Sequence, residues 1–139
     1  MIVLDTNVLS EILRLTPEAR VLSWLQAQPR TMLFTTTITR GEMFYGVQLL
    51  PEGKRKASML AEVRAIFAAD FAGQILAFDN DAADAYAEIS ATRKTMGKPI
   101  AQLDAMIAAI ALSRGARLAT RNIKDFVGCG VEIINPWDE

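Results

Sequence analysis

The sequence predicts an α/β fold, with a central, mainly parallel five-stranded sheet flanked by helices. Two observations predict it. Short apolar stretches typical of buried strands alternate along the chain with longer stretches of helical periodicity, an order that is characteristic of α/β proteins. Three of these strands are separated by helices long enough for right-handed crossovers. The chain has 139 residues, 51% of them hydrophobic, and contains no repeat or long linker, so we expect one domain over residues 1–139.

The first half of the chain contains two expected strands and four expected helices. A branched apolar run that stops at a charge predicts the first strand, and apolar residues at helical spacing predict the helices. Proline and glycine mark the breaks between them. In order, we expect a strand over residues 2–4, a helix capped by Asn7 and ending at Leu13, a helix over 18–26, a strand over 32–35, a helix capped by Thr37 or Thr39, and a long amphipathic helix that ends near Phe71.

The second half contains three further strands and two helices. The segment 97–99, Gly-Lys-Pro, breaks the chain between the helices, and Gly115 closes the second of them. That second helix is the most apolar in the sequence and is therefore expected to be buried. In order, we expect a strand over residues 75–78, a helix capped by Asn80 or Asp81 and running toward Met96, a helix over 103–113, and strands over 117–120 and 131–134.

Acidic residues fall at unusual places in this scheme. Asp5 follows the first apolar strand directly, at the carboxyl end where open α/β sheets bind their ligands. Glu42 lies in the first half of its helix, and Asp104 begins the most apolar helix. Asn122 and Asp125 lie three residues apart after the fourth strand, so either side chain could join the same site.

Each of these residues has an ordinary structural explanation. Asp5 could cap a helix, and Asp104 could be a favourable charge at a helix N-terminus. Glu42 could be an exposed helix residue, and Asp125 could be a surface cap. Together, however, the acids would converge at one edge of the sheet and repel one another, which a divalent cation would relieve. The ligands are oxygens, and the chain has no His and one Cys, so Mg²⁺ or Mn²⁺ is favoured over Zn²⁺. Any hydrolysis would use metal-activated water, because no histidine base exists.

Four stretches of the sequence resemble the PIN-domain ribonucleases, specifically the VapC-like toxins of bacterial toxin–antitoxin pairs. They are LDTNVLSE at 4–11, TRGEMFYG at 39–46, LDAMIAA at 103–109 and LATRNIKDF at 118–126, and together they span nearly the whole chain. The opening MIVLDTNVLSE and the closing NPW at 135–137 are similar to the FitB-like branch. Any one stretch is a weak signal, whereas four in order at fitting spacing are a strong one.

The resemblance implies roles for individual residues. Asp5, Glu42 and Asp104 match the acidic metal site of the family, with Asp5 and Asp104 as direct ligands and Glu42 acting through water. Thr6 and Thr120 match small hydroxyl residues beside that site. This chain has Asn122 where some relatives have Asp, and Asp125 is a nearby alternative, so the fourth acidic position and a second metal ion stay open.

The reaction that the resemblance implies is endonucleolytic cleavage of RNA, leaving a 5′ phosphate and a 3′ hydroxyl. The net charge of −1 gives the chain no overall attraction to nucleic acid, so RNA contacts must come from local cations. Those flanking the motifs are Arg40, Lys98 and Arg121, with Arg14 and Lys124 nearby. Ordinary surface charge is the alternative for each of them. The basic run at residues 54–56 opens a helix, and we expect it to be solvated.

The resemblance also implies partners. Family toxins pair as homodimers, and a small antitoxin of the VapB or FitA type inhibits the toxin, often with an Arg near the acidic pocket, and supplies DNA binding. Phe44, Tyr45, Val47 and Leu50 could receive an antitoxin helix, although core packing is favoured for Phe44 and Val47. A lone cysteine, no signal-peptide pattern and no apolar run long enough for a bilayer predict a cytoplasmic protein outside the membrane.

Two other functional classes fit parts of the sequence. A haloacid-dehalogenase-like phosphatase also has Asp after its first strand, but it needs a second Asp two residues later, where this chain has Asn7. The second alternative is a catalytically weak binding subunit that acts through an antitoxin in a DNA-bound repressor complex. Asn122 in place of an acid keeps that alternative open.

Overall fold

Five parallel strands form the centre of the protein in a computed structural model that describes residues 1–139. The strand order is β3-β2-β1-β4-β5, and all four pairings are parallel. Ile2 in the central strand β1 pairs with Leu33 of β2 on one side and with Arg117 of β4 on the other. The expected five-stranded sheet is confirmed, with the bounds β1 Ile2–Leu4, β2 Leu33–Thr36, β3 Ile75–Leu76, β4 Arg117–Ala119 and β5 Ile133–Ile134.

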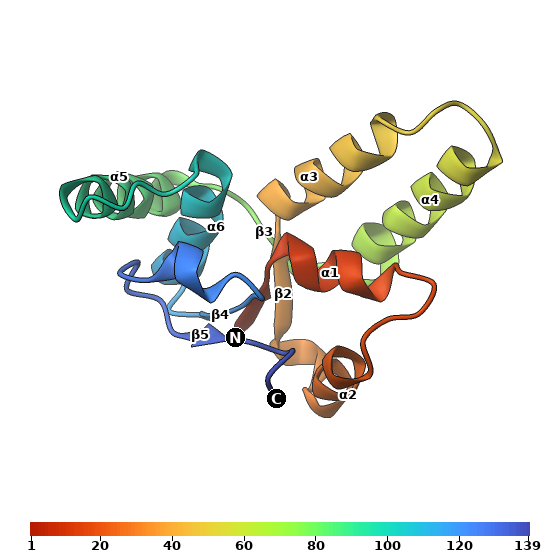
Figure 1. Ribbon diagram of the computed structural model, residues 1–139, viewed down its shortest axis with the longest axis horizontal. Helices are drawn as coiled ribbons and strands as arrows, with labels where there is room; N and C mark the ends of the chain where they lie inside the picture. The colour runs from red at the N-terminus through yellow and green to blue at the C-terminus, as the bar shows by residue number, and fades with distance from the viewer.

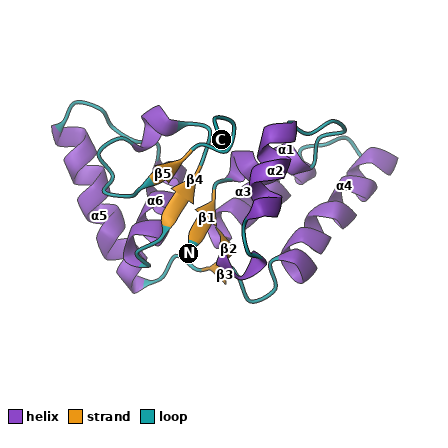
Figure 2. Ribbon diagram, turned by 90° about the horizontal axis from the view of Figure 1, so that it is seen from below, coloured by secondary structure: helices purple, strands orange, loops and turns teal.

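Helices cover both faces of this sheet (Figures 1 and 2). The expected helices are all present, and three short helical turns join them. The long helix reaches the region of Phe71 as expected, because α4 continues into a π-helical turn, η2. The bounds are α1 Thr6–Ile12, α2 Ala19–Ala27, α3 Thr37–Gln48, α4 Lys54–Ala65, α5 Asn80–Thr95 and α6 Gln102–Ser113, with the turns η1 Arg30–Met32, η2 Ile66–Asp70 and η3 Ile123–Phe126.

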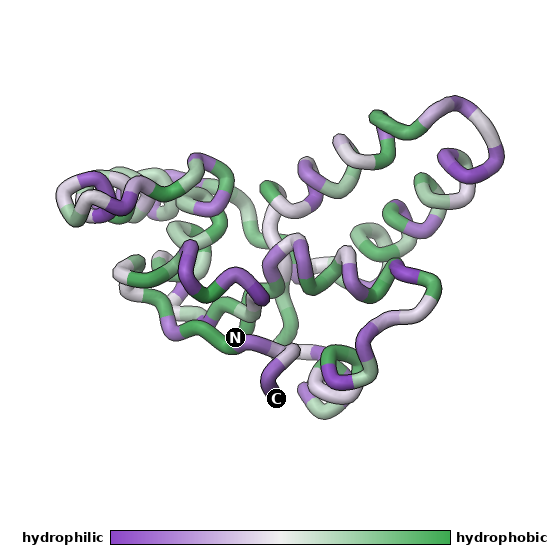
Figure 3. The backbone as a smooth tube through the Cα atoms, viewed as in Figure 1, coloured by the Kyte–Doolittle hydropathy of each residue, from purple (hydrophilic) through white to green (hydrophobic).

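Each face of the sheet has its own hydrophobic core. Successive residues of a strand point to opposite faces, so Val3 packs toward α5 and α6, whereas Ile2 and Leu4 pack toward α1–α4. Hydrophobic and hydrophilic residues alternate along α4 in Figure 3, as expected of a helix with one face on the core. No helix in the structure is long and apolar enough to span a membrane.

Two helices begin earlier than the sequence indicated. Asp5, not Asn7, is the N-cap of α1, and its carboxylate accepts a hydrogen bond from the backbone of Thr6. Thr36, not Thr37 or Thr39, caps α3, and its hydroxyl accepts from the backbone N–H of Thr39 at 3.0 Å. An N-cap residue must have extended backbone angles. The residue that leaves a strand already has them, so the cap falls directly at the strand end.

The same correction applies to α5. Asp79, not Asn80 or Asp81, is its N-cap, and the Asp79 carboxylate accepts from the backbone N–H of Ala82 at 3.0 Å. Asp79 is extended, whereas Asn80 and Asp81 already lie within the helix. Asp81 instead contributes a negative charge to the first turn, where the helix dipole favours it.

Thr35 carries a hydroxyl that no group in the protein satisfies. The residue is fully buried in β2, and its Oγ1 has no hydrogen-bond partner. We expect Thr35→Val to raise the free energy of unfolding by about 1 kcal/mol, because it removes an unsatisfied polar group at nearly constant volume. The matched change Thr36→Val should lower it by about 1 kcal/mol through loss of the α3 cap. Urea denaturation measures both; destabilisation by Thr35→Val would contradict the assignment.

Candidate active site

Four carboxylates from four separate elements share one region at the carboxyl edge of the sheet. Asp5 follows the central strand β1, Glu42 lies on α3, Asp104 in the first turn of α6, and Asp125 in η3. The negative charges of Asp5, Glu42 and Asp125 all act on Asp104, and those of Glu42 and Asp125 act on Asp5. The structure therefore brings together acids that are up to 120 positions apart in the sequence.

Asp5 is the most enclosed of the four acids, with 4% of its surface exposed. Its Oδ1 accepts from the Thr6 backbone N–H and its Oδ2 from the Thr120 hydroxyl, both at 2.8 Å. Burial raises the pKa of the Asp5 carboxyl, these hydrogen bonds oppose the rise, and the charges of Glu42 and Asp125 add to it. Asp5 thus both caps α1 and holds a costly negative charge in a fixed orientation.

Thr120 is the centre of the hydrogen-bond network around Asp5. Its buried hydroxyl donates to Asp5 and accepts from the backbone N–H of Asn122 at 3.1 Å and from the Asn7 side-chain amide at 3.2 Å. The side-chain oxygen of Asn7, Oδ1, in turn accepts from the backbone N–H of Arg121 at 3.4 Å. We expected Asn7 only as a helix cap, so its place in the site is a finding of the structure. Its position two residues after Asp5 was the signal available in the sequence.

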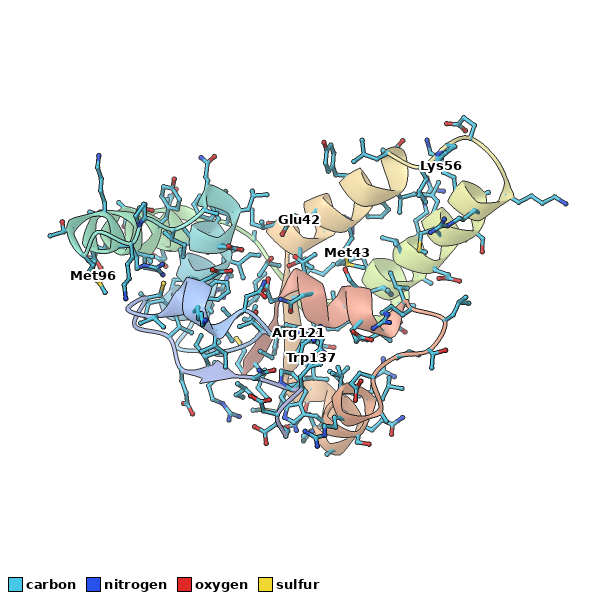
Figure 4. The ribbon with its side chains drawn as sticks, in the orientation of Figure 1. Glu42, Met43, Lys56, Met96, Arg121 and Trp137 are labelled. Atoms are coloured by element: carbon cyan, nitrogen blue, oxygen red, sulfur yellow. The ribbon has the colours of Figure 1, made fainter.

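Glu42 is held by a second hydroxyl. Thr6 Oγ1 donates to Glu42 Oε1 at 2.7 Å and lies 3.0 Å from Thr39 Oγ1. Figure 4 places Glu42 in the half of α3 that lies nearer α6. Thr6 therefore links α1 to α3 and orients the Glu42 carboxylate, while its own backbone N–H binds Asp5.

Asp104 has the pKa that departs most clearly from its ordinary value. Burial, followed by the charges of Asp5, Asp125 and Glu42, raises the pKa of Asp104 to about 6. The side chain is half-buried at the start of α6. The favourable end of the helix dipole does not offset the crowding of four negative charges.

This shift predicts how stability depends on pH. The pKa of Asp104 is raised from its ordinary value of 3.8 to about 6 in the folded protein. Protonation of Asp104 therefore stabilises the folded, metal-free protein at low pH, and this contribution is lost as the pH rises through 6. Asp104→Asn should therefore raise the free energy of unfolding at neutral pH by about 1 kcal/mol, after discounting for solvent screening. Urea denaturation at about pH 4.5 and about pH 7.5 should show a clearly larger gain at the higher pH, because only part of the destabilisation is present at the lower one. Destabilisation at both would favour a simple helix-dipole role.

The donor set of the pocket fits a hard divalent cation. None of the four carboxylates forms an ion pair with a Lys or Arg; the salt bridges of the protein use Glu11, Glu52, Asp70 and Asp79. The remaining donors are the hydroxyls of Thr6 and Thr120, so every candidate ligand is an oxygen, as Mg²⁺ and Mn²⁺ prefer. As the side chains stand, no three His, Cys, Asp or Glu residues are grouped to hold one ion. Water would therefore have to complete any coordination.

The cations expected to contact a substrate lie in different surroundings. The Arg40 guanidinium lies over the rings of Phe44 and Phe67, 5.3 and 5.6 Å from their centroids. Residues two apart on a helix do not share a face, so Arg40 does not point the same way as Glu42. The structure therefore gives Arg40 a packing role on α3 and η2.

Arg121 and Lys124 stay beside the acidic pocket. Arg121 follows Thr120 and stacks over the Trp137 ring at 5.2 Å, an arrangement visible in Figure 4. Both cations line a small surface cavity together with Asp125. Lys98 is exposed in the turn that leads into α6. Arg121 and Lys124 thus lie near Asp125, and Lys98 is exposed on the turn that precedes Asp104 in the chain.

A groove of about 860 Å³ lies between α1, α3 and α4 and reaches Thr6 and Glu42. Its lining is partly apolar, and it also carries charges of both signs. Of the surface expected to bind a helix, Val47 and Leu50 line this groove, whereas Phe44 packs on Phe67 and Tyr45 is exposed to solvent. The other lining residues are Ser10, Leu13, Arg14, Leu15, Met43, Gly46, Arg55, Ser58, Met59, Glu62 and Val63.

Comparison with known proteins adds to this geometry. A family model described as PIN domain matches residues 2–126. The chain is 41% identical over 138 residues to the VapC ribonuclease Y4jK of Sinorhizobium fredii, covering 99% of both chains, and 40% identical over 139 residues to the toxin FitB of Neisseria gonorrhoeae, covering all of both. It is also similar to a solved structure of FitAB bound to an IR36 DNA fragment, with a TM-score of 0.92, 42% identity, and coverage of 99% of this chain and 96% of that one.

Proposed function

Since the chain belongs to the PIN-domain family, among the VapC and FitB toxins of toxin–antitoxin systems, we propose that it is a metal-dependent endoribonuclease. One observation carries the proposal. Four carboxylates on four elements lie near enough at the carboxyl edge of the sheet for three of them to act electrostatically on Asp104, and no Lys or Arg is paired to any of them. Unpaired acids repel one another, and a bound divalent cation would offset that repulsion.

In this proposal Asp5 and Asp104 hold Mg²⁺ or Mn²⁺ directly, and Glu42 holds it through water. The bound ion supplies a Lewis acid for the scissile phosphate and lowers the pKa of the attacking water. The protein fixes the direction of each carboxylate. Thr120 and the Thr6 backbone orient Asp5, and the Thr6 hydroxyl orients Glu42. Asp125, rather than Asn122, is the fourth acidic group, because its charge reaches Asp5 and Asp104.

RNA would approach the pocket along its cationic rim. Lys98, Arg121 and Lys124 are exposed, the last two of them beside Asp125, and would bind phosphates without reading bases. The expected products are a 5′ phosphate and a 3′ hydroxyl. Arg40 contributes less to this contact than the sequence suggested, since its guanidinium is occupied by two aromatic rings.

The groove between α1, α3 and α4 is the proposed site for an antitoxin of the VapB or FitA type. An amphipathic helix suits a groove with an apolar lining and charged edges. Because the groove ends at Glu42 and Thr6, a bound antitoxin could place an Arg against the acidic pocket and block it. FitAB has been solved bound to a DNA fragment. We propose that here the antitoxin supplies the DNA contact and that a homodimer of this chain is the toxin unit.

The experiment that tests the proposal uses antitoxin-free protein and total cellular RNA with Mg²⁺, and maps new 5′ ends by sequencing. An EDTA arm and the Asp104→Asn protein are the controls. We expect discrete cuts that are absent from both controls, which would also identify the RNA target. Cuts equal in wild type and variant would overturn the assignment of the site. No cuts in wild type would favour a binding subunit that acts through its antitoxin.

A further inference from the structure

Arg93 is a buried cation that the proposed reaction does not use. It lies in the last turn of α5, with 5% of its surface exposed, and it forms no ion pair with any carboxylate. Burial of a charged group is costly unless hydrogen bonds compensate for it. The position of Arg93 therefore depends on what its guanidinium binds.

The guanidinium binds main-chain carbonyls from two segments. Its Nε donates to the carbonyl oxygen of Lys98 at 2.7 Å, and its Nη1 donates to the carbonyl oxygen of Asp125 at 2.6 Å. Nη1 also lies 3.6 Å from the sulfur of Cys129. The Arg93 carbonyl in turn accepts from the backbone N–H of Lys98 at 3.0 Å. One side chain thus joins the end of α5, the turn before α6, and η3.

Both segments lead to acids of the pocket. The turn at Lys98 enters α6, whose first turn carries Asp104, and η3 carries Asp125 itself. Asp125 itself is exposed, whereas its neighbour Phe126 is buried in the core with residues of α6. Packing therefore anchors η3 at Phe126 but does not hold the Asp125 side chain. The main chain of Asp125 makes two hydrogen bonds. Its N–H donates to the Asn122 carbonyl, and its carbonyl accepts from Arg93. The second of these bonds links η3 to the end of α5.

Arginine is suited to this link. Its planar guanidinium presents several donors in fixed directions, so it can bind two carbonyls at once, whereas the single nitrogen of Lys is a compact point donor on a flexible chain. Without the guanidinium, the Lys98 and Asp125 carbonyls would each lose this partner. The turn that precedes Asp104 and the turn that holds Asp125 would then lose the side-chain hydrogen bonds that join them.

We infer that Arg93 is a positioning residue, which sets Asp125 against Asp104 by holding the turn at Lys98 and η3 together from behind the pocket. The inference rests on the proposed function, because it takes Asp104 and Asp125 to be part of a metal site. The hydrogen bonds of Arg93 do not depend on that function. Arg93 touches neither ion nor substrate. It acts through the two main-chain carbonyls, as groups outside the ligand set of a metal site commonly do.

The first test is calorimetric titration of metal-free protein with Mn²⁺ alone. Arg93→Met should raise the dissociation constant about ten- to a hundredfold, and Arg93→Lys should have a smaller effect because it keeps the charge and one donor. The matched control is Arg114→Met, which loses an exposed ion pair to Asp79 at the other end of α5 and should bind as wild type. In an Asp125→Asn background, Arg93→Met should change the affinity less than about twofold. An equal effect in both backgrounds would overturn the inference.

The second test needs no metal. Amide hydrogen exchange should become faster at Lys98 and Asp125 in Arg93→Met, while exchange in β1 stays unchanged. Faster exchange throughout the chain, or no change at these two amides, would mean that Arg93 only contributes to overall stability. If wild-type protein binds no Mn²⁺, the metal site of the proposed function fails, and the exchange rates still decide the role of Arg93.

Discussion

Replacing Asp5 by Asn is expected to lower the rate of RNA cleavage at least about a hundredfold while the protein stays folded. The change removes one negative charge from the pocket and one proposed metal ligand. The amide can keep the structural role, because Asn is as good a helix N-cap as Asp. Its oxygen can still accept from the Thr6 backbone. The Thr120 hydroxyl already accepts from Asn7 and Asn122, so only its own hydrogen bond to the second Asp5 oxygen is lost. Chemistry and folding are therefore separable at this position.

Cleavage of a defined target RNA, followed by gel electrophoresis under excess substrate, measures this effect. Asp84→Asn is the matched control, since it removes the same charge from an exposed position on α5 and should cleave as wild type. Circular dichroism checks that both variants are folded. If folded Asp5→Asn cleaved RNA at the wild-type rate, Asp5 would be a helix cap and nothing more.

Thr120→Val should produce the largest loss of stability among single changes at the site. The Thr120 hydroxyl is fully buried and makes three hydrogen bonds, with Asp5, Asn7 and the backbone of Asn122. Valine has nearly the same shape but removes all three bonds and leaves the buried Asp5 carboxylate without this donor, which should cost about 2 kcal/mol of unfolding free energy. Cleavage should also fall about tenfold or more, because Asp5 loses one of the groups that orient it.

Thr120→Ser is the control for this prediction, since it keeps the hydroxyl and removes only a methyl group. Urea denaturation and the cleavage assay should place it close to wild type and well above Thr120→Val. If Ser and Val were equally damaging, the methyl packing of Thr120 would matter rather than its hydrogen bonds. That result would remove Thr120 from the machinery of the site.

Most of the fold could be predicted from local sequence patterns. The bounds of β1 are as expected, because an apolar strand that ends in a charge leaves little choice. The strands expected over residues 75–78 and 131–134 are shorter, at Ile75–Leu76 and Ile133–Ile134. Each is an edge strand, so it lasts only as long as its single neighbour pairs with it. That limit depends on register, which a local pattern does not contain.

The candidate site was predictable where a residue broke a local pattern. Asp5, Glu42 and Asp104 are acids among apolar residues, and the structure brings them together with Asp125. Asn7 and Arg93 broke no pattern. Asn7 acts on Thr120, which is 113 positions away, and Arg93 acts on the backbone of Asp125, which is 32 positions away. Such contacts follow from the chain topology and not from the neighbouring residues.

The direction of Arg40 also does not follow from a local argument, and Arg40 stays a predicted RNA contact. It lies two residues before Glu42 in the sequence, which suggested a shared role in binding RNA. A helix turns its side chains by about 100° per residue, so neighbours two apart point to different sides. The structure accordingly places Arg40 over Phe44 and Phe67.

The central claim is that the four acids form a site for a divalent cation. Thermal unfolding of wild type and Asp5→Asn, each with and without Mn²⁺, tests it most directly. An ion that binds only the folded state should stabilise wild type by about 2.7 kcal/mol at a hundred times its dissociation constant, and should leave Asp5→Asn unchanged. Equal stabilisation of both proteins, or none in wild type, would contradict the claim.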